Sequence, residues 1–156
     1  MQETYLMIKP DGIKHKEEIF SILKEHGLMI KKHKEIKTNM EIMKHLLDHY
    51  QGVINEMKPE FSFVGKLFNS FYYGDYSIIP MHVVYDGDED IITKTRTLVG
   101  ATNPQDAKEN TLRHKFSTDS YAIADKEDRL VNNVIHAADS KESAQRELKI
   151  WKELLD

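Results

Sequence analysis

The run NVIHAADS, residues 133–140, carries a histidine between a short apolar stretch and the predicted start of a helix. Asp139 is expected to cap this helix, with Glu142 three residues later in a capping-box pattern. Apolar residues then recur at helical spacing and mark its buried face: Ala144, Leu148, Trp151 and Leu155. The stretch therefore predicts that the chain closes with a helix that packs on the core and is preceded by His136.

Toward the amino terminus, predicted helices alternate with a few strands. Strand-like runs lie at residues 4–8, 28–36 and 78–85, and a last strand is expected at 121–124 or 131–135. Helical faces lie at 19–23, ending at Gly27, and at 42–50, 61–71 and 90–98, before a long polar loop from Gly100. Pro80 predicts an edge position or an entry turn for the early part of its strand. This order of elements predicts an α/β (α+β) sandwich in which helices cover an antiparallel or mixed sheet.

Length and composition are those of one globular domain spanning residues 1–156, with 40% hydrophobic and 31% charged residues. No apolar run approaches the ~20 residues that cross a bilayer, so no contact with a membrane is expected. The absence of cysteine excludes disulfides and thiolate metal sites, and it is compatible with the cytoplasmic location that we expect. A net charge of -4 argues against general binding to nucleic acid, which requires a basic face.

His136 is a candidate nucleophile, because an uncharged imidazole has a free nitrogen lone pair at neutral pH. A catalytic histidine also needs a partner that fixes its tautomer. Glu147 lies beside the buried face of the closing helix and can reach back toward a histidine that precedes that helix. On spacing alone, such a pair is more often a surface pair or a satisfied pair in the core. Other motifs must therefore support the catalytic role.

Side chains suited to phosphate occur in two further segments. Lys9 follows a predicted strand and precedes a Pro-Asp-Gly turn, which would hold its ammonium group at the edge of the sheet. Arg96, Thr102 and Arg113 offer two guanidinium groups and a hydroxyl, donors that suit diphosphate and triphosphate oxygens. The chain has neither a P-loop nor the glycine-rich loop of protein kinases, so these donors are the candidates for phosphate binding.

Three motifs taken together, KPDG at residues 9–12, GATNP at 100–104 and NVIHAADS at 133–140, make the chain similar to the nucleoside diphosphate kinase family over nearly its whole length. The resemblance implies a ferredoxin-like fold, with an antiparallel sheet covered by helices. It also implies transfer of the γ-phosphate of a nucleoside triphosphate, typically ATP, to a nucleoside diphosphate by a ping-pong mechanism. The nucleotides would be the partners, and the chain would form a homo-oligomer, a tetramer or hexamer built from dimers.

The resemblance assigns four catalytic positions. His136 would become the phosphohistidine, and Glu147 would hydrogen-bond the imidazole nitrogen that is not phosphorylated. Lys9 would contact the sugar hydroxyl and the transferred phosphate. Tyr50 would lie near both the histidine and the lysine.

The resemblance also assigns the nucleotide contacts. Asn133 would hold the ribose hydroxyls together with Lys9, while phosphate oxygens would be bound by Arg96, Thr102 and Arg113. The base would stack on an aromatic ring, either Phe61 or Phe63. Mg2+ would arrive on the nucleotide phosphates rather than bind to protein ligands. The acidic residues 86–90 are accordingly interpreted as a turn that leads into a helix.

The chain departs from the family pattern at three places. Ala138 stands where a serine hydroxyl is common, Ala101 replaces the usual glutamate before Thr-Asn-Pro, and the polar stretch 117–128 is extra material that could act as a lid or change the assembly. Ala138 leaves open an alternative function, a catalytically weakened member that binds nucleotides or serves as a scaffold. A nucleic-acid-binding protein of similar fold is a second alternative, suggested by the basic run KKHK at 31–34, but it disagrees with the overall acidity.

Overall fold

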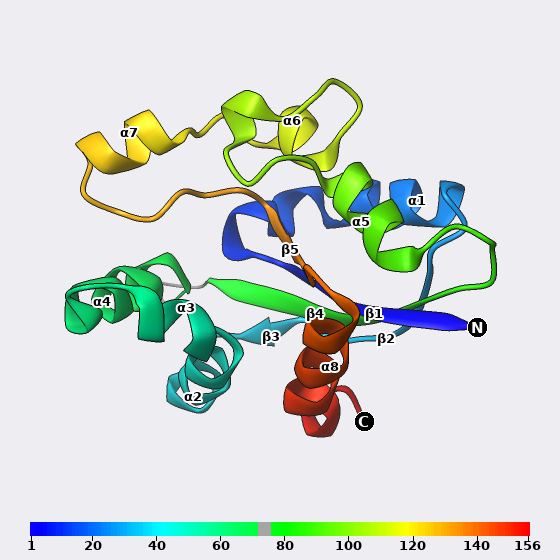
Figure 1. The fold of residues 1–156 in the computed structure, drawn as a ribbon, viewed down its shortest axis with the longest axis horizontal. Coiled ribbons are helices and arrows are strands. Elements are labelled where there is room, and N and C mark those ends of the chain that lie inside the picture. Colours follow the sequence, from blue (N-terminus) through cyan, green and yellow to red (C-terminus); the bar gives the residue numbers. More distant parts are fainter. Residues whose placement is uncertain (72–75) are drawn as a thin grey trace.

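The structure, a computed structural model, describes residues 1–71 and 76–156 and has a five-stranded sheet with helices on both faces (Figure 1). The strands are β1 (Gln2–Ile8), β2 (Met29–His33), β3 (Ile36–Lys37), β4 (Ser77–Tyr85) and β5 (Ile135–Ala137). They lie in the order β2, β4, β1, β5, with β3 also paired to β4, and every pairing is antiparallel. The prediction of a ferredoxin-like α/β sandwich with an antiparallel sheet covered by helices is confirmed.

Eight α-helices and two short 3-10 helices connect the strands in the described part of the chain. The α-helices are α1 (Lys16–Glu25), α2 (Met40–His49), α3 (Gln51–Glu56), α4 (Glu60–Phe71), α5 (Ile91–Val99), α6 (Leu112–Phe116), α7 (Tyr121–Lys126) and α8 (Lys141–Leu155). The 3-10 helices are η1 (Pro10–His15) and η2 (Pro104–Asp106). None of these helices is long and apolar enough to span a bilayer.

The central strand β1 contributes to the hydrophobic core on both faces of the sheet. Because successive side chains of a strand point to opposite faces, Leu6 and Ile8 join one cluster and Tyr5 and Met7 join another. The first cluster is completed by α1 and α5, and the second by α2, α4 and α8 (Figure 1). The buried strand then ends directly before Lys9, where the candidate site begins.

The last strand lies at Ile135–Ala137, so the predicted range 121–124 is wrong and 131–135 overlaps it only at Ile135, whereas the closing helix lies where it was predicted and differs only in its cap. Residues 121–124 begin α7, because the Ser120 side chain caps the helix by accepting a hydrogen bond from Ile123 N at 3.1 Å. Residues 131–134 lie before β5, and the predicted polar loop after residue 100 contains η2, α6 and α7. The closing helix is capped by Ser140 rather than Asp139, since the Ser140 hydroxyl accepts from Ser143 N at 3.0 Å.

Pro80 lies inside β4, opposite Met7 of β1, and the prediction of an edge or an entry turn was wrong. Residues 28–36, predicted as one strand, form β2 and β3 with an interruption at Lys34 and Glu35. Lys34 N donates to Pro80 O at 3.4 Å across this interruption. A proline has no amide hydrogen to donate, so the break in the neighbouring strand lies beside the one residue of β4 that cannot complete a ladder.

Val134 forms a tight turn directly before β5. Its φ of 74° lies in the left-handed region, which is rare and costly for a β-branched residue. Three hydrogen bonds hold this conformation: Ile135 N donates to Asn133 O at 2.8 Å, Lys9 N donates to Val134 O at 2.8 Å, and Val134 N donates to the Asp11 carboxylate at 3.0 Å. The KPDG turn after β1 thus fixes the turn that positions His136.

The substitution Gly12→Ala tests this contact between the two turns. A Cβ atom at residue 12 would lie 2.5 Å from Val134 O, a backbone atom, so one of the turns must move. We expect the free energy of unfolding, measured by urea denaturation, to fall by about 2 kcal/mol, the usual cost of overpacking. Gly65→Ala is the matched control, because a Cβ there meets nothing within 4 Å in α4 and should stabilise the helix by about 0.5–1 kcal/mol. Equal stability of the Gly12→Ala variant and the unsubstituted protein would contradict the proposed tight contact.

Candidate functional site

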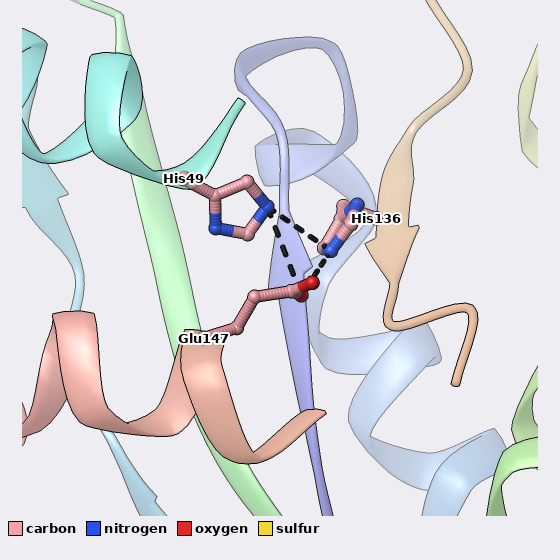
Figure 2. A group of neighbouring side chains, drawn as sticks. All are labelled: His49, His136 and Glu147. Carbon is pink, nitrogen blue, oxygen red and sulfur yellow. Dashed lines mark hydrogen bonds and ion pairs between the residues drawn. The ribbon is translucent and has the colours of Figure 1, made fainter. Parts of the chain in front are cut away.

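Three side chains from different elements meet beside the paired strands β1 and β5. His49 at the end of α2, His136 in β5 and Glu147 in α8 point toward one another (Figure 2). The His136 Nε2 atom lies 2.5 Å from Glu147 Oε1 and 3.1 Å from His49 Nε2. The predicted pair of His136 and Glu147 is therefore brought together, and Nδ1 is the nitrogen on the opposite side of the His136 ring.

The surroundings of this pair keep the imidazole uncharged. Burial lowers the pKa of His136 to about 3, and the nearby cations Lys9 and Arg113 act in the same direction. Burial raises the pKa of Glu147 to about 7, although the neighbouring His49 and Arg146 lower it. At neutral pH the imidazole thus has a lone pair available, and the carboxyl group is close to its own titration point.

His49 is a site residue that the sequence analysis did not identify. Its side chain is almost fully buried, and its ring contacts the rings of Tyr5, Tyr50, His136 and Trp151. Ile42, Leu46 and His49 follow the i, i+4, i+7 spacing of the buried face of α2. A histidine on an otherwise apolar helical face was the signal in the sequence, because a buried polar group needs a partner.

Lys9 and Asn133 lie together, as the sequence analysis expected. Lys9 Nζ donates to Asn133 Oδ1 at 2.7 Å, and Asn133 Nδ2 donates to the Thr102 carbonyl at 2.9 Å. Burial and the nearby Arg113 lower the pKa of Lys9 to about 8. Thr102, Asn133 and Lys9 therefore form one hydrogen-bonded set that connects the GATNP loop, the turn before β5 and the end of β1.

The two arginines are anchored to the backbone around β5. Arg113 is buried and donates to the carbonyls of Asn133, Gly100 and Ile135 at 3.2, 3.0 and 2.7 Å. These bonds use three of its five N–H donors and leave two for another acceptor. Arg96 donates to the Ala137 carbonyl at 3.1 Å. Both guanidinium groups thus flank the strand that carries His136, where an anion would offset their positive charge.

A cavity of about 350 Å³ opens beside this set of residues. Five of the predicted site residues line it: Lys9, Tyr50, Phe63, Thr102 and Asn133. Among the described residues, the Tyr50 hydroxyl is buried without a hydrogen-bond partner, so a ligand could satisfy it. Of the two aromatic candidates, Phe63 lines the cavity, whereas Phe61 is 92% exposed and does not line it.

The extra segment 117–128 forms a second wall of the cavity. Tyr121, Ala124 and Asp125 of α7 line it together with residues of α3 and α4, and these helices lie at the same end of the molecule in Figure 1. The base of the segment is closed by a two-pronged ion pair in which Arg129 donates to Asp119 at 2.7 and 3.0 Å. A further ion pair, Lys66 to Asp128 at 2.9 Å, connects α4 with the residues after α7. The first ion pair thus joins the two ends of the segment, and the second ties its carboxyl-terminal end to α4.

The three converging side chains offer ligand atoms that lie within 4.8 Å of one another. Within the described residues, the one cluster of three or more histidine or carboxylate ligand atoms close enough to share an ion is that of His49, His136 and Glu147. Two imidazoles and one carboxylate do not suit Mg2+, which prefers oxygen ligands and water. The 2.5 Å between His136 Nε2 and Glu147 Oε1 is a hydrogen-bond distance, whereas two ligands of a tetrahedral zinc would lie roughly 3.3 Å apart. The geometry therefore indicates a hydrogen-bonded group.

Comparison with known proteins assigns the family. The family model described as nucleoside diphosphate kinase matches residues 2–154. The chain is 35% identical over 153 residues to a nucleoside diphosphate kinase of Saccharolobus islandicus, covering 97% of this chain and 94% of the relative. It is 30% identical over 154 residues to that of Streptococcus pneumoniae, covering 97% and 99%.

Solved structures agree with this assignment. A nucleoside-diphosphate kinase of Borrelia burgdorferi with bound vanadate and ADP superposes with a TM-score of 0.81 at 25% identity, covering 96% of this chain and 86% of that chain. An NDP kinase of Pyrobaculum aerophilum gives a TM-score of 0.76 at 27% identity, covering 99% of both chains. Fold, sequence and the match across residues 2–154 agree, and the chain belongs to the nucleoside diphosphate kinase family.

Proposed function

We propose that this enzyme transfers the γ-phosphate of a nucleoside triphosphate, typically ATP, to a nucleoside diphosphate through a phosphohistidine on His136. The observation that carries the proposal is the position of one imidazole. His136 Nε2 is bound to Glu147 at 2.5 Å, while Nδ1 lies on the other side of the ring, and the cations Lys9 and Arg113 act on the same ring. An uncharged imidazole with one nitrogen fixed and the other free is suited to nucleophilic attack.

The first half-reaction follows from this arrangement. The lone pair of His136 Nδ1 forms a bond to the γ-phosphorus, and the bond from that phosphorus to the β,γ-bridging oxygen breaks, so the diphosphate leaves with the electron pair. The positive charge that develops on the ring is stabilised by Glu147, whose oxygen lies 2.5 Å from Nε2. Lys9, Arg96 and Arg113 supply positive charge for the phosphate oxygens, the largest contribution expected in phosphoryl transfer.

The second half-reaction reverses the first with a different nucleotide. A terminal phosphate oxygen of the incoming diphosphate attacks the phosphorus, and the bond to Nδ1 breaks and returns the lone pair to the ring. One site serves both steps, because the donor and the acceptor differ only in base and sugar. This gives ping-pong kinetics.

The base and sugar of the nucleotide are proposed to lie in the 350 Å³ cavity, and its phosphates to extend from there toward His136, which does not line the cavity. Lys9 and Asn133 would hold the ribose hydroxyls, Thr102 would bind phosphate oxygens, and Tyr50 would contact the ligand through its unpaired hydroxyl. Phe63 is the proposed stacking partner of the base, since it lines the cavity whereas Phe61 does not. Stacking accepts every base, so broad base tolerance is expected.

Mg2+ is part of the substrate in this proposal. The hard oxygens of the β- and γ-phosphates suit Mg2+, whereas the imidazole-rich group at Glu147 does not. Self-association into a tetramer or hexamer built from dimers belongs to the same proposal and rests on the family resemblance.

Intact-mass measurement tests the phosphohistidine directly. Brief incubation with ATP and Mg2+ should add a single acid-labile phosphate, which should disappear when a different nucleoside diphosphate is added. The His136→Ala variant should acquire none and lose nucleoside diphosphate kinase activity by several orders of magnitude. Nucleotide binding without a phosphate adduct in the unsubstituted protein would instead favour the weakened member, a binding or scaffolding protein in which Ala138 lacks the family's hydroxyl.

Two phenylalanine variants test the position of the base. Phe63→Ala should raise the KM for nucleoside diphosphates about 10-fold, because one base–aromatic stacking contact contributes about 1–3 kcal/mol. Phe61→Ala is the matched control, since its side chain is 92% exposed, and its KM should stay unchanged. Steady-state kinetics with nucleoside diphosphates of two different bases should show the same increase in KM for both. A larger effect for Phe61→Ala would place the base outside the cavity.

The pKa shifts predict a narrow pH optimum. As the pH falls through about 7, Glu147 gains a proton and no longer accepts from His136 Nε2, so the rate of phosphoenzyme formation should fall while His136 stays uncharged. As the pH rises above about 8, Lys9 loses its charge and the KM should increase. Rapid-quench kinetics between pH 5.5 and 9.5, a range chosen to bracket both pKa values, measure the two limbs.

The Glu147→Gln variant is the control for the acidic limb. A glutamine cannot titrate, so this variant should react more slowly but lose the dependence on pH below about 7. An acidic limb that persists unchanged in Glu147→Gln would assign it to the nucleotide phosphates rather than to Glu147.

A further inference from the structure

A buried tryptophan fixes the hydrogen-bonding role of His49. Trp151 Nε1 donates to His49 Nδ1 at 3.0 Å, and both side chains are almost completely buried. An indole N–H can only donate, so His49 Nδ1 is the nitrogen with the lone pair. Burial lowers the pKa of His49 well below its usual value, which keeps the ring neutral. The proton of the neutral ring is therefore on Nε2, and that atom is a donor.

The His49 N–H is directed at the pair of His136 and Glu147. Its Nε2 lies 3.1 Å from His136 Nε2 and 3.7 Å from Glu147 Oε1, as the dashed lines of Figure 2 indicate. Two arrangements of protons are possible at this point. In one, His136 Nε2 has no proton and accepts from His49, which places the proton of His136 on Nδ1. In the other, His136 Nε2 donates to Glu147, and His49 must also donate to Glu147, because two N–H groups cannot face each other.

Only the second arrangement leaves His136 Nδ1 free to attack phosphorus. It requires a shift of about half an ångström, because 3.7 Å exceeds the 2.7–3.2 Å of an N–H to oxygen bond. It also requires that Glu147 remain a carboxylate, since a protonated acid would donate to His136 and reverse the tautomer. A second donor to the Glu147 oxygen favours its charged form.

We propose that His49 is a positioning residue for phosphoryl transfer: held as a donor by Trp151, it stabilises the Glu147 carboxylate and thereby selects the tautomer of His136 with a free Nδ1. This inference rests on the proposed function of His136. In this chain residue 138 is an alanine and offers no hydroxyl, so His49 is the side-chain donor beside Glu147 that the geometry provides. Arg146 lies at 4.0 Å from the other carboxylate oxygen and is directed to the carbonyls of Asp48 and His49.

A matched pair of variants separates donation from packing. His49→Gln keeps an N–H donor at a similar reach, whereas His49→Met fills similar space without one. Single-turnover formation of the phosphoenzyme should slow about 10-fold in His49→Met, with little change in nucleotide affinity, and His49→Gln should recover most of the rate. Trp151→Phe removes only the indole donor and part of the ring, so its rate of phosphoenzyme formation should lie between those of the two His49 variants. Equal rates for Gln and Met in folded variants, or the full rate in His49→Met, would overturn the proposal.

Nitrogen-15 NMR of the histidine rings tests the tautomer without any nucleotide. At pH 8, His136 should have its proton on Nε2 in the unsubstituted protein, and His49→Met should shift part of the population to the Nδ1–H form. A proton on His136 Nδ1 in the unsubstituted protein would refute the inference, even if every variant failed to fold. Because this measurement needs no phosphoryl transfer, absence of a phosphoenzyme would contradict the proposed function alone and leave the role of His49 separately tested.

Discussion

The half-buried carboxylate of Asp11 accepts a hydrogen bond from the amide of Val134 and so connects the first turn of the chain with the last strand. Without this bond the Val134 amide would lose its acceptor. A β-branched residue adopts a left-handed φ only when its surroundings impose it. In the same turn, Val134 O accepts a hydrogen bond from Lys9 N, and Asn133 Oδ1 accepts one from Lys9 Nζ. The positions of nucleophile, lysine and asparagine therefore depend on one strained residue.

Positive charge is concentrated around this turn. Burial and the charge of Arg113 lower the pKa of Lys9 to about 8, and burial and the charge of Arg96 lower the pKa of Arg113 to about 10. Each cation is kept in place by hydrogen bonds to neutral oxygens, and the Asp11 carboxylate offsets only part of the charge of Lys9 and Arg113. An anionic ligand removes this repulsion, so the arrangement is preorganised for phosphate before any ligand arrives.

Periodicity in the sequence predicted the elements that pack on the core, because their apolar spacing reflects burial. It placed β1, β4 and most of α2, α4, α5 and α8 correctly. It could not place β5, since Ile135–Ala137 is too short to show alternation and is positioned by bonds to distant turns. Candidate site residues were recognised through motifs, whereas His49 belongs to no motif and Phe63 differs from Phe61 only through the course of α4. Such distinctions depend on tertiary contacts.

Arg113 holds three backbone carbonyls of two separate segments with one planar group. A lysine would offer a single nitrogen and a glutamine one amide, so neither could reach the same three oxygens. Any replacement leaves buried carbonyls without donors, and a second substitution elsewhere cannot supply all of them at once. No single replacement can therefore keep these contacts, so Arg113 should tolerate substitution far less than the exposed residues of α6.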